Sequence, residues 1–153
     1  MMFARALLAF LILPGMFAGL LPWVLARADP WRGEAHSVGF VVLGGGLIVL
    51  LWCVRDFYVS GKGTLAPWDP PRHLVVVGLY RFARNPMYLG VLLVVGGWAL
   101  VMSSPLLAGY LLLLAGGFHL RVVRYEEPWL ATQFGSEWSA YSAAVPRWLL
   151  RRG

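Results

Sequence analysis

Residues 72–90 read RHLVVVGLYRFARNPMYLG, a stretch that differs in composition from almost everything else in the chain. It contains four arginines or histidines, two tyrosines and an Asn85-Pro86 step directly before a hydrophobic run. Asn is favoured at the position that caps a helix, and Pro is favoured as the first helical residue. The stretch therefore predicts a polar loop that ends where a helix begins, at Asn85-Pro86.

Most of the remaining chain is apolar enough to lie in lipid. Hydrophobic residues make up 59% of the 153 residues and charged residues only 13%, whereas soluble domains carry about 25% charged residues. A helix needs roughly 20 apolar residues to cross a bilayer. We expect an all-α polytopic membrane protein, a single domain over residues 1–153 with four transmembrane helices, the first kinked near Pro14. The four spans are Phe3–Ala26, Val38–Tyr58, Met87–Met102 and Leu106 to about Val122. Gly44-Gly45-Gly46 in the second span predicts close helix packing, and Ser103-Ser104-Pro105 predicts a tight turn between the last two spans.

The basic residues predict the orientation of these helices. With four spans, both termini and the loop before Asn85 share one side of the membrane, and only Arg27 and Arg32 lie on the other side. Lys and Arg concentrate in cytoplasmic loops, so both termini are predicted to be cytoplasmic, in the inner or plasma membrane of a prokaryote. This asymmetry explains the net charge of +6, so the positive charge does not indicate that the protein binds nucleic acid. The cytoplasmic basic residues are Arg5, Arg55, Lys62, Arg72, Arg81, Arg84, Arg121, Arg124, Arg147, Arg151 and Arg152.

The polar groups available for chemistry lie at the cytoplasmic boundary, in residues 72–90 and in Tyr125-Glu126-Glu127-Pro128. The sequence has no charged residue near the middle of a predicted span, which argues against an ion pathway. It has no His/Cys set with zinc spacing, so no metal is predicted. The amphipathic, aromatic-rich residues 128–153 are predicted to form short cytoplasmic helices on the membrane surface.

Several of these residues have a structural interpretation as well as a functional one. Asn85 can simply cap a helix, and Tyr80 and Tyr88 can be interfacial aromatic residues. Glu127 can pair with Arg124 at an exposed surface. The functional interpretation begins with the fourth helix: if it continues past its span, His119, Val123 and Glu126 share one face. The residues alone leave both interpretations open.

Three segments together, GLYRFARNPMYLG, EEPWL and FGSEWSAYSAAVPRW, resemble the isoprenylcysteine carboxyl methyltransferase family and its relatives among phospholipid methyltransferases. The resemblance covers about residues 61–150, the predicted cofactor-binding part. It implies an integral membrane enzyme that uses S-adenosylmethionine without a Rossmann domain. A lipophilic small molecule or lipid would enter from the bilayer, and the oligomeric state is left open.

The resemblance also implies functional residues. Asn85 stands where the family usually has His, which keeps hydrogen bonding but removes a titratable group. The substrate-binding arginine of the eukaryotic enzyme has no counterpart in register, although Arg121 and Arg124 lie nearby. The candidate catalytic residues are Arg84, Arg121 and Glu126. The candidate cofactor-binding residues are His73, Leu74, Val75, Tyr80, Asn85, Pro86, Met87, Tyr88, His119, Glu126 and Glu127.

Methyl transfer from a sulfonium needs alignment and water exclusion more than acid–base help. A cofactor with an ammonium, a carboxylate and a ribose needs both signs of charge nearby, and Arg84 and the two glutamates provide them. Two alternatives are a non-catalytic membrane binding or assembly subunit and a small four-helix transporter. The intact Arg84–Tyr88 and Glu126-Glu127 elements favour the enzyme, and a transporter would need a charge at mid-membrane.

Overall fold

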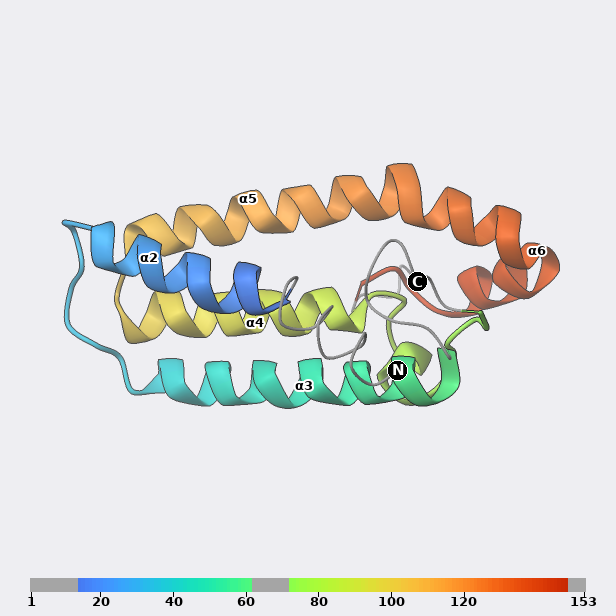
Figure 1. Ribbon diagram of the computed structural model, residues 1–153, viewed down its shortest axis with the longest axis horizontal. Coiled ribbons are helices and arrows are strands. Elements are labelled where there is room, and N and C mark those ends of the chain that lie inside the picture. The colour runs from blue at the N-terminus through green and yellow to red at the C-terminus, as the bar shows by residue number, and fades with distance from the viewer. Residues whose placement is uncertain (1–13, 62–71, 149–153) are drawn as a thin grey trace.

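The computed structural model describes residues 14–61 and 72–148, and all regular structure in these ranges is helical. Helices α3, α4 and α5 run side by side, and α2 lies against α4 and α5 (Figure 1). The fold class predicted from composition, all-α, is confirmed. The elements are η1 (Met16–Leu20), α2 (Leu21–Ala28), α3 (Val38–Gly61), η2 (Gly78–Arg81), α4 (Pro86–Val101), α5 (Pro105–Arg121), η3 (Val122–Glu126) and α6 (Glu127–Ala144).

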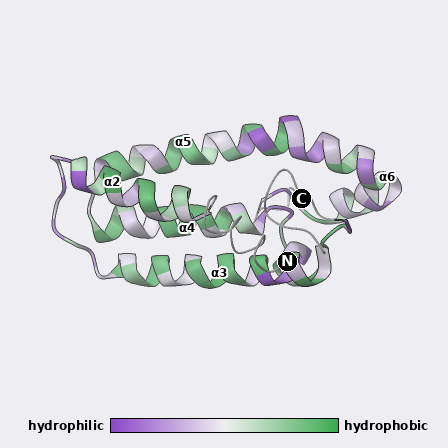
Figure 2. Cartoon of the chain, in the orientation of Figure 1, coloured by the Kyte–Doolittle hydropathy of each residue, from purple (hydrophilic) through white to green (hydrophobic). Residues whose placement is uncertain are grey.

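Two helical segments of the described chain are long and apolar enough to cross a membrane: α3, and residues 105–144, which contain α5, η3 and α6. The second segment leaves helical geometry at Gly135, inside α6. Helix α4 has 16 residues, about 24 Å at 1.5 Å per residue, and residues 16–28 form a shorter apolar helix. Part of the first predicted span, residues 3–13, lies outside the described residues. Figure 2 shows the apolar residues along the helices and the hydrophilic ones gathered toward the ends of the bundle.

Glycines let α3 and α4 approach each other closely. A Cβ on Gly97 would lie 2.6 Å from Leu43 Cα, and one on Gly46 would lie 2.7 Å from the backbone nitrogen of Val94. Small residues at such crossings allow close backbone packing. The predicted packing role of the Gly44–Gly46 cluster is therefore confirmed for Gly46, whereas Gly44 and Gly45 face open space.

The first helix departs from α geometry between its two prolines. Residues 16–20 form a π-helical turn that leads into α2 without a break. Pro22 lacks an N–H and its ring crowds the carbonyl of Ala18, and a wider turn before a proline relieves such crowding. The irregularity therefore lies in the turn before Pro22. The residues before Pro14, which the predicted kink near Pro14 also involves, lie outside the described residues.

Asp29 links the end of α2 to the start of α5, at the end of the bundle opposite to the glutamates. Its carboxylate accepts hydrogen bonds from the Ser104 hydroxyl, from the Leu106 N–H at 3.0 Å and from the Trp31 N–H at 2.9 Å. The Ser104 bond is the main reason why the pKa of Asp29 is lowered from 3.8. Ser104 also caps α5 by accepting from the Leu107 N–H at 3.2 Å. The tight turn predicted from Ser103-Ser104-Pro105 is confirmed.

Candidate functional site

The first turn of α4 meets the end of α5 at a triad of polar side chains. Tyr88 donates its hydroxyl hydrogen to Glu126 Oε1. Arg121 Nε donates to the same oxygen at 2.7 Å and to the Tyr88 hydroxyl at 3.2 Å. The Tyr88 ring lies on Phe118, with 4.3 Å between the ring centroids. Three predicted site residues from separate parts of the sequence are thus brought together.

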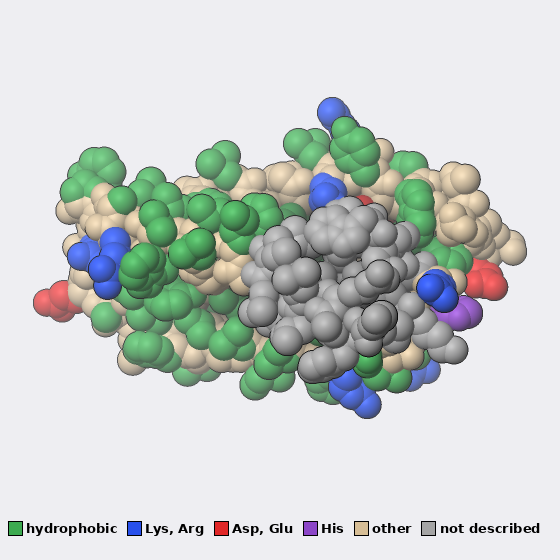
Figure 3. Space-filling model, viewed as in Figure 1, with side chains coloured by type: hydrophobic (Ala, Val, Ile, Leu, Met, Phe, Trp, Pro, Cys, Tyr) green, Lys and Arg blue, Asp and Glu red, His purple; other side chains and the backbone are tan. Residues whose placement is uncertain are grey.

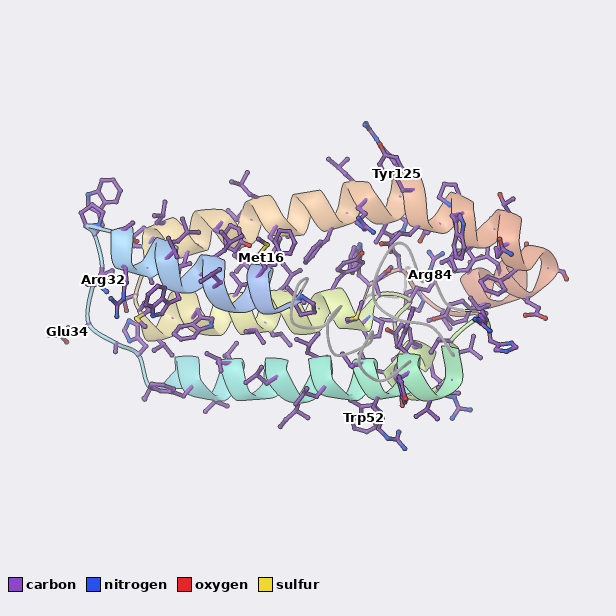
Figure 4. All side chains as sticks on the ribbon, viewed as in Figure 1. Met16, Arg32, Glu34, Trp52, Arg84 and Tyr125 are labelled. Atoms are coloured by element: carbon purple, nitrogen blue, oxygen red, sulfur yellow. The ribbon has the colours of Figure 1, made fainter. Side chains whose placement is uncertain are left out.

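A second cluster surrounds the next glutamate. Arg147 binds Glu127 through two bonds, Nε to Oε1 at 2.8 Å and Nη2 to Oε2 at 2.7 Å. Arg84 Nη1 lies 3.1 Å from Glu127 Oε1. The side chains of Arg84 and Glu127 are only 13% and 15% exposed. Figure 4 shows Arg84 at the end of the bundle where α6 turns back on itself.

The two arginines respond differently to this shared carboxylate. Burial lowers the pKa of Arg84 from its ordinary value, and the nearby charge of Glu127 opposes that effect. The hydrogen bonds to Glu127 raise the pKa of Arg147. The difference follows from burial, because the Arg147 side chain is 33% exposed and the Arg84 side chain only 13%. Both guanidinium groups stay charged at neutral pH.

The structural interpretation of Glu127 as the partner of exposed Arg124 is wrong, because its partners are Arg84 and Arg147. Arg147 reaches Glu127 because the tail returns to the start of α4. The π-helical turn η3, between α5 and α6, also changes which residues share a face. A regular α-helix would also align His119 with Glu126 at the predicted spacing. Instead, Glu126 contacts Arg121 and Tyr88, and His119 Nδ1 accepts from the Trp148 Nε1–H at 3.3 Å.

Asn85 precedes α4 as predicted, with Pro86 as the first helical residue, but its side chain does not cap the helix. The amide Nδ2 instead donates to the main-chain oxygen of Arg147 at 3.1 Å. The Arg84 N–H donates to the Pro146 oxygen at 2.9 Å. The tail therefore runs along the start of α4, and its main chain provides the partner that sequence reasoning assigned to the helix.

The remaining predicted cofactor residues lie around the segment that leads into α4. Tyr80 and Val75 are buried against Cys53, and Met87 packs between this cluster and the main core. The Tyr80 oxygen accepts from the Tyr141 hydroxyl of α6 at 2.7 Å. The last two predicted residues are less enclosed, since His73 is exposed and Leu74 half-buried.

Comparison with known proteins identifies the family. Residues 35–137, well over half of the chain, match the phospholipid methyltransferase family model. The chain belongs to the phospholipid methyltransferase family. Phospholipid methyltransferases are enzymes that use S-adenosylmethionine, so this chain is an S-adenosylmethionine-dependent methyltransferase. No curated protein and no solved structure gives a significant match.

The charged groups at this end of the bundle have the chemistry that binding of S-adenosylmethionine needs. Two carboxylates and three guanidinium groups bring both signs of charge to one end of the bundle, beside the aromatic rings of Tyr88 and Phe118. The buried Arg84 Nε has no hydrogen-bond partner among residues 14–61 and 72–148. In the same ranges no group of three His, Cys, Asp or Glu residues could hold a metal ion.

Sequence reasoning missed Arg147 as a site residue. It lies beyond the residues matched by the family model, and its role depends on the tail folding back to α4. The FGSEWSAYSAAVPRW segment contains this arginine, but its local sequence predicts only a basic residue on the cytoplasmic side of the membrane. Tyr125 is the opposite case, because it is 72% exposed and points away from the bundle (Figure 4).

Proposed function

We propose that this chain transfers a methyl group from S-adenosylmethionine to a lipophilic acceptor at the cytoplasmic face of the membrane. The observation that carries the proposal is the pair of adjacent glutamates, each held by arginine. Glu126 contacts Arg121 and Tyr88, and Glu127 contacts Arg84 and Arg147. Two separately anchored carboxylates beside the start of α4 suit a ligand that carries several polar groups.

The residues divide into cofactor contacts and positioning groups. Glu126 would accept from the ammonium or the ribose hydroxyls, and Arg84 would meet the carboxylate. Further cofactor contacts would come from the His73–Val75 segment, Tyr80, His119 and residues 85–88. When bound, S-adenosylmethionine supplies the methyl group on a sulfonium.

The chain itself contributes alignment and exclusion of water. Tyr88 and Phe118 pack together at the apolar end of the glutamate cluster, where an acceptor from the bilayer would approach. Holding two reactants in line can give effective molarities of roughly 10⁵–10⁸ M in favourable cases. Arg121 is half exposed, at 49%, and is the group best placed to orient an acidic acceptor. An isoprenylcysteine-like carboxylate is therefore the second candidate beside a phospholipid.

The proposed topology has four spans with both termini in the cytoplasm. Arg32 lies toward one end of the bundle and Arg84 toward the other (Figure 4), and Arg121 and Arg147 pair with the two glutamates. Figure 3 shows hydrophobic side chains over the left half of the visible face, with basic side chains at the left end and at several places over the right half. A C-terminal reporter fusion should give a cytoplasmic signal because basic residues remain on the cytoplasmic side. A periplasmic signal would contradict the four-span arrangement.

Two measurements on protein purified in detergent test the function. Isothermal titration with S-adenosylhomocysteine, the reaction product of the cofactor, should show binding. Incubation with S-adenosylmethionine and a bacterial lipid extract, followed by mass spectrometry, should show lipids that are heavier by one methyl group. Cofactor binding without any methylated lipid would instead support the non-catalytic subunit. Absence of cofactor binding would refute the proposal.

A further inference from the structure

The cluster of Arg84, Glu127 and Arg147 has a net charge of +1. Two guanidinium groups share one carboxylate. The pairing uses Arg84 Nη1 and Arg147 Nε and Nη2. Among the described residues Arg84 Nε remains buried without an acceptor. A buried donor without a partner is costly, so this arrangement is expected to have another ligand.

The surrounding contacts fix both arginines in place. The Arg84 guanidinium lies over the ring of Trp138, 5.4 Å from its centroid, and the main-chain N–H of Arg84 donates to the Pro146 oxygen. Arg147 is held by its own oxygen, which accepts from Asn85, and by two bonds to Glu127. Guanidinium groups that are held in advance lose little entropy when they bind a planar or tetrahedral oxyanion.

We propose that Arg84 and Arg147, organised by Glu127, form a subsite for an oxyanion, and that the tail thereby completes the site through Arg147. The inference rests on the proposed function, which provides two oxyanions of suitable chemistry. One is the carboxylate of the cofactor and the other is the phosphate of a phospholipid head group. Both accept charge-assisted hydrogen bonds from arginine. The net charge of +1 on the cluster favours an anion even though Glu127 belongs to it.

The test compares two variants of the full chain, Arg147→Gln and Arg124→Gln. Arg124 is the matched control, because it has the same charge change near the same helix end and is exposed without an ion pair among the described residues. Arg147→Lys serves as a second variant, which keeps the charge and loses the two-bond geometry. Each protein is titrated with S-adenosylhomocysteine and with its decarboxylated analogue, and its KM for phospholipid is measured in mixed micelles.

If the oxyanion is the cofactor carboxylate, Arg147→Gln should weaken S-adenosylhomocysteine binding about 10- to 100-fold. Affinity for the decarboxylated analogue should hardly change, and Arg147→Lys should be intermediate. If the oxyanion is the lipid phosphate, both nucleoside affinities should stay near wild type and the KM for phospholipid should rise by a similar factor. Either pattern supports the subsite, provided that Arg124→Gln behaves as wild type.

Equal losses for the two nucleosides with an unchanged KM would show that Arg147 only stabilises the fold, and would overturn the subsite. Unchanged values in every titration would do the same. A wild-type protein that binds neither nucleoside would refute the proposed function itself, which separates that failure from the failure of the subsite.

Discussion

Replacing the two adjacent glutamates one at a time should separate cofactor binding from folding. Glu126 pairs with Arg121, and the side chains of these residues are 29% and 49% exposed. An exposed pair of this kind contributes about 0–1 kcal/mol to stability. If Glu126 contacts the cofactor, Glu126→Gln should nevertheless weaken binding by about 1.5–3 kcal/mol, the value of a hydrogen bond to a charged group.

Glu127 should behave in the opposite way. Its side chain and that of Arg84 are mostly buried, and removing its charge leaves two guanidinium groups facing each other. Loss of one partner from a buried pair costs about 3–5 kcal/mol, and partial exposure reduces this to about 2–3 kcal/mol. For a chain of this size that is a fall in Tm of roughly 4–12 °C. Glu126→Gln should lower Tm much less.

Isothermal titration with S-adenosylhomocysteine and thermal melting in the same detergent measure both quantities on both variants. If Glu126→Gln binds S-adenosylhomocysteine like wild type, Glu126 does not contact the cofactor. If Glu127→Gln melts at the wild-type temperature, Glu127 does not stabilise the fold through Arg84 and Arg147. Equal losses of affinity at equal stability would also contradict these assignments, because the two carboxylates would then have one shared role.

Two further predictions concern Asn85 and Asp29. Asn85→Asp should lower stability by about 1–3 kcal/mol, because Asp cannot donate to the Arg147 oxygen, while Asn85→His should keep a donor. Melting temperatures of the two variants test this prediction. An Asp variant as stable as wild type would restore the helix-cap interpretation. For Asp29, hydrogen bonding to Ser104 lowers the pKa below 3.8, so its stabilisation is complete above that pH and is lost as pH falls through the folded value. Wild type should therefore lose more stability than Asp29→Asn between about pH 5 and pH 3, and parallel melting curves would contradict the assignment.

Local sequence signals predicted helix boundaries well. Pro86 and Pro105 begin α4 and α5, because a proline at the first helical position loses no hydrogen bond. Apolar runs likewise located α3 and α5, since burying a hydrophobic surface in lipid or protein needs only composition and length. The glycines at 44–46 predicted close packing, but only the partner helix determines which of them faces it.

The partners of the charged residues could not be read from the sequence. Glu127 meets Arg84 and Arg147 because the tail returns to the start of α4, and no local pattern encodes that return. The π-helical turn at 122–126 also changes which residues share a face, so the predicted alignment of His119 with Glu126 was lost. The residues near the glutamates were predictable as a set, whereas their pairing depends on tertiary contacts.

The most direct test of the central claim is transfer of labelled methyl groups in lipid vesicles. Wild-type protein and the Glu126→Gln variant are reconstituted, supplied with S-adenosylmethionine labelled in its methyl group, and the extracted lipids are counted and analysed by mass spectrometry. The glutamate site predicts labelled lipid from wild type and a reduction of about 10-fold or more in the variant at limiting cofactor. Equal labelling by the two proteins would contradict the assignment of the site, and no labelling by wild type that binds the cofactor would contradict methyl transfer to lipid.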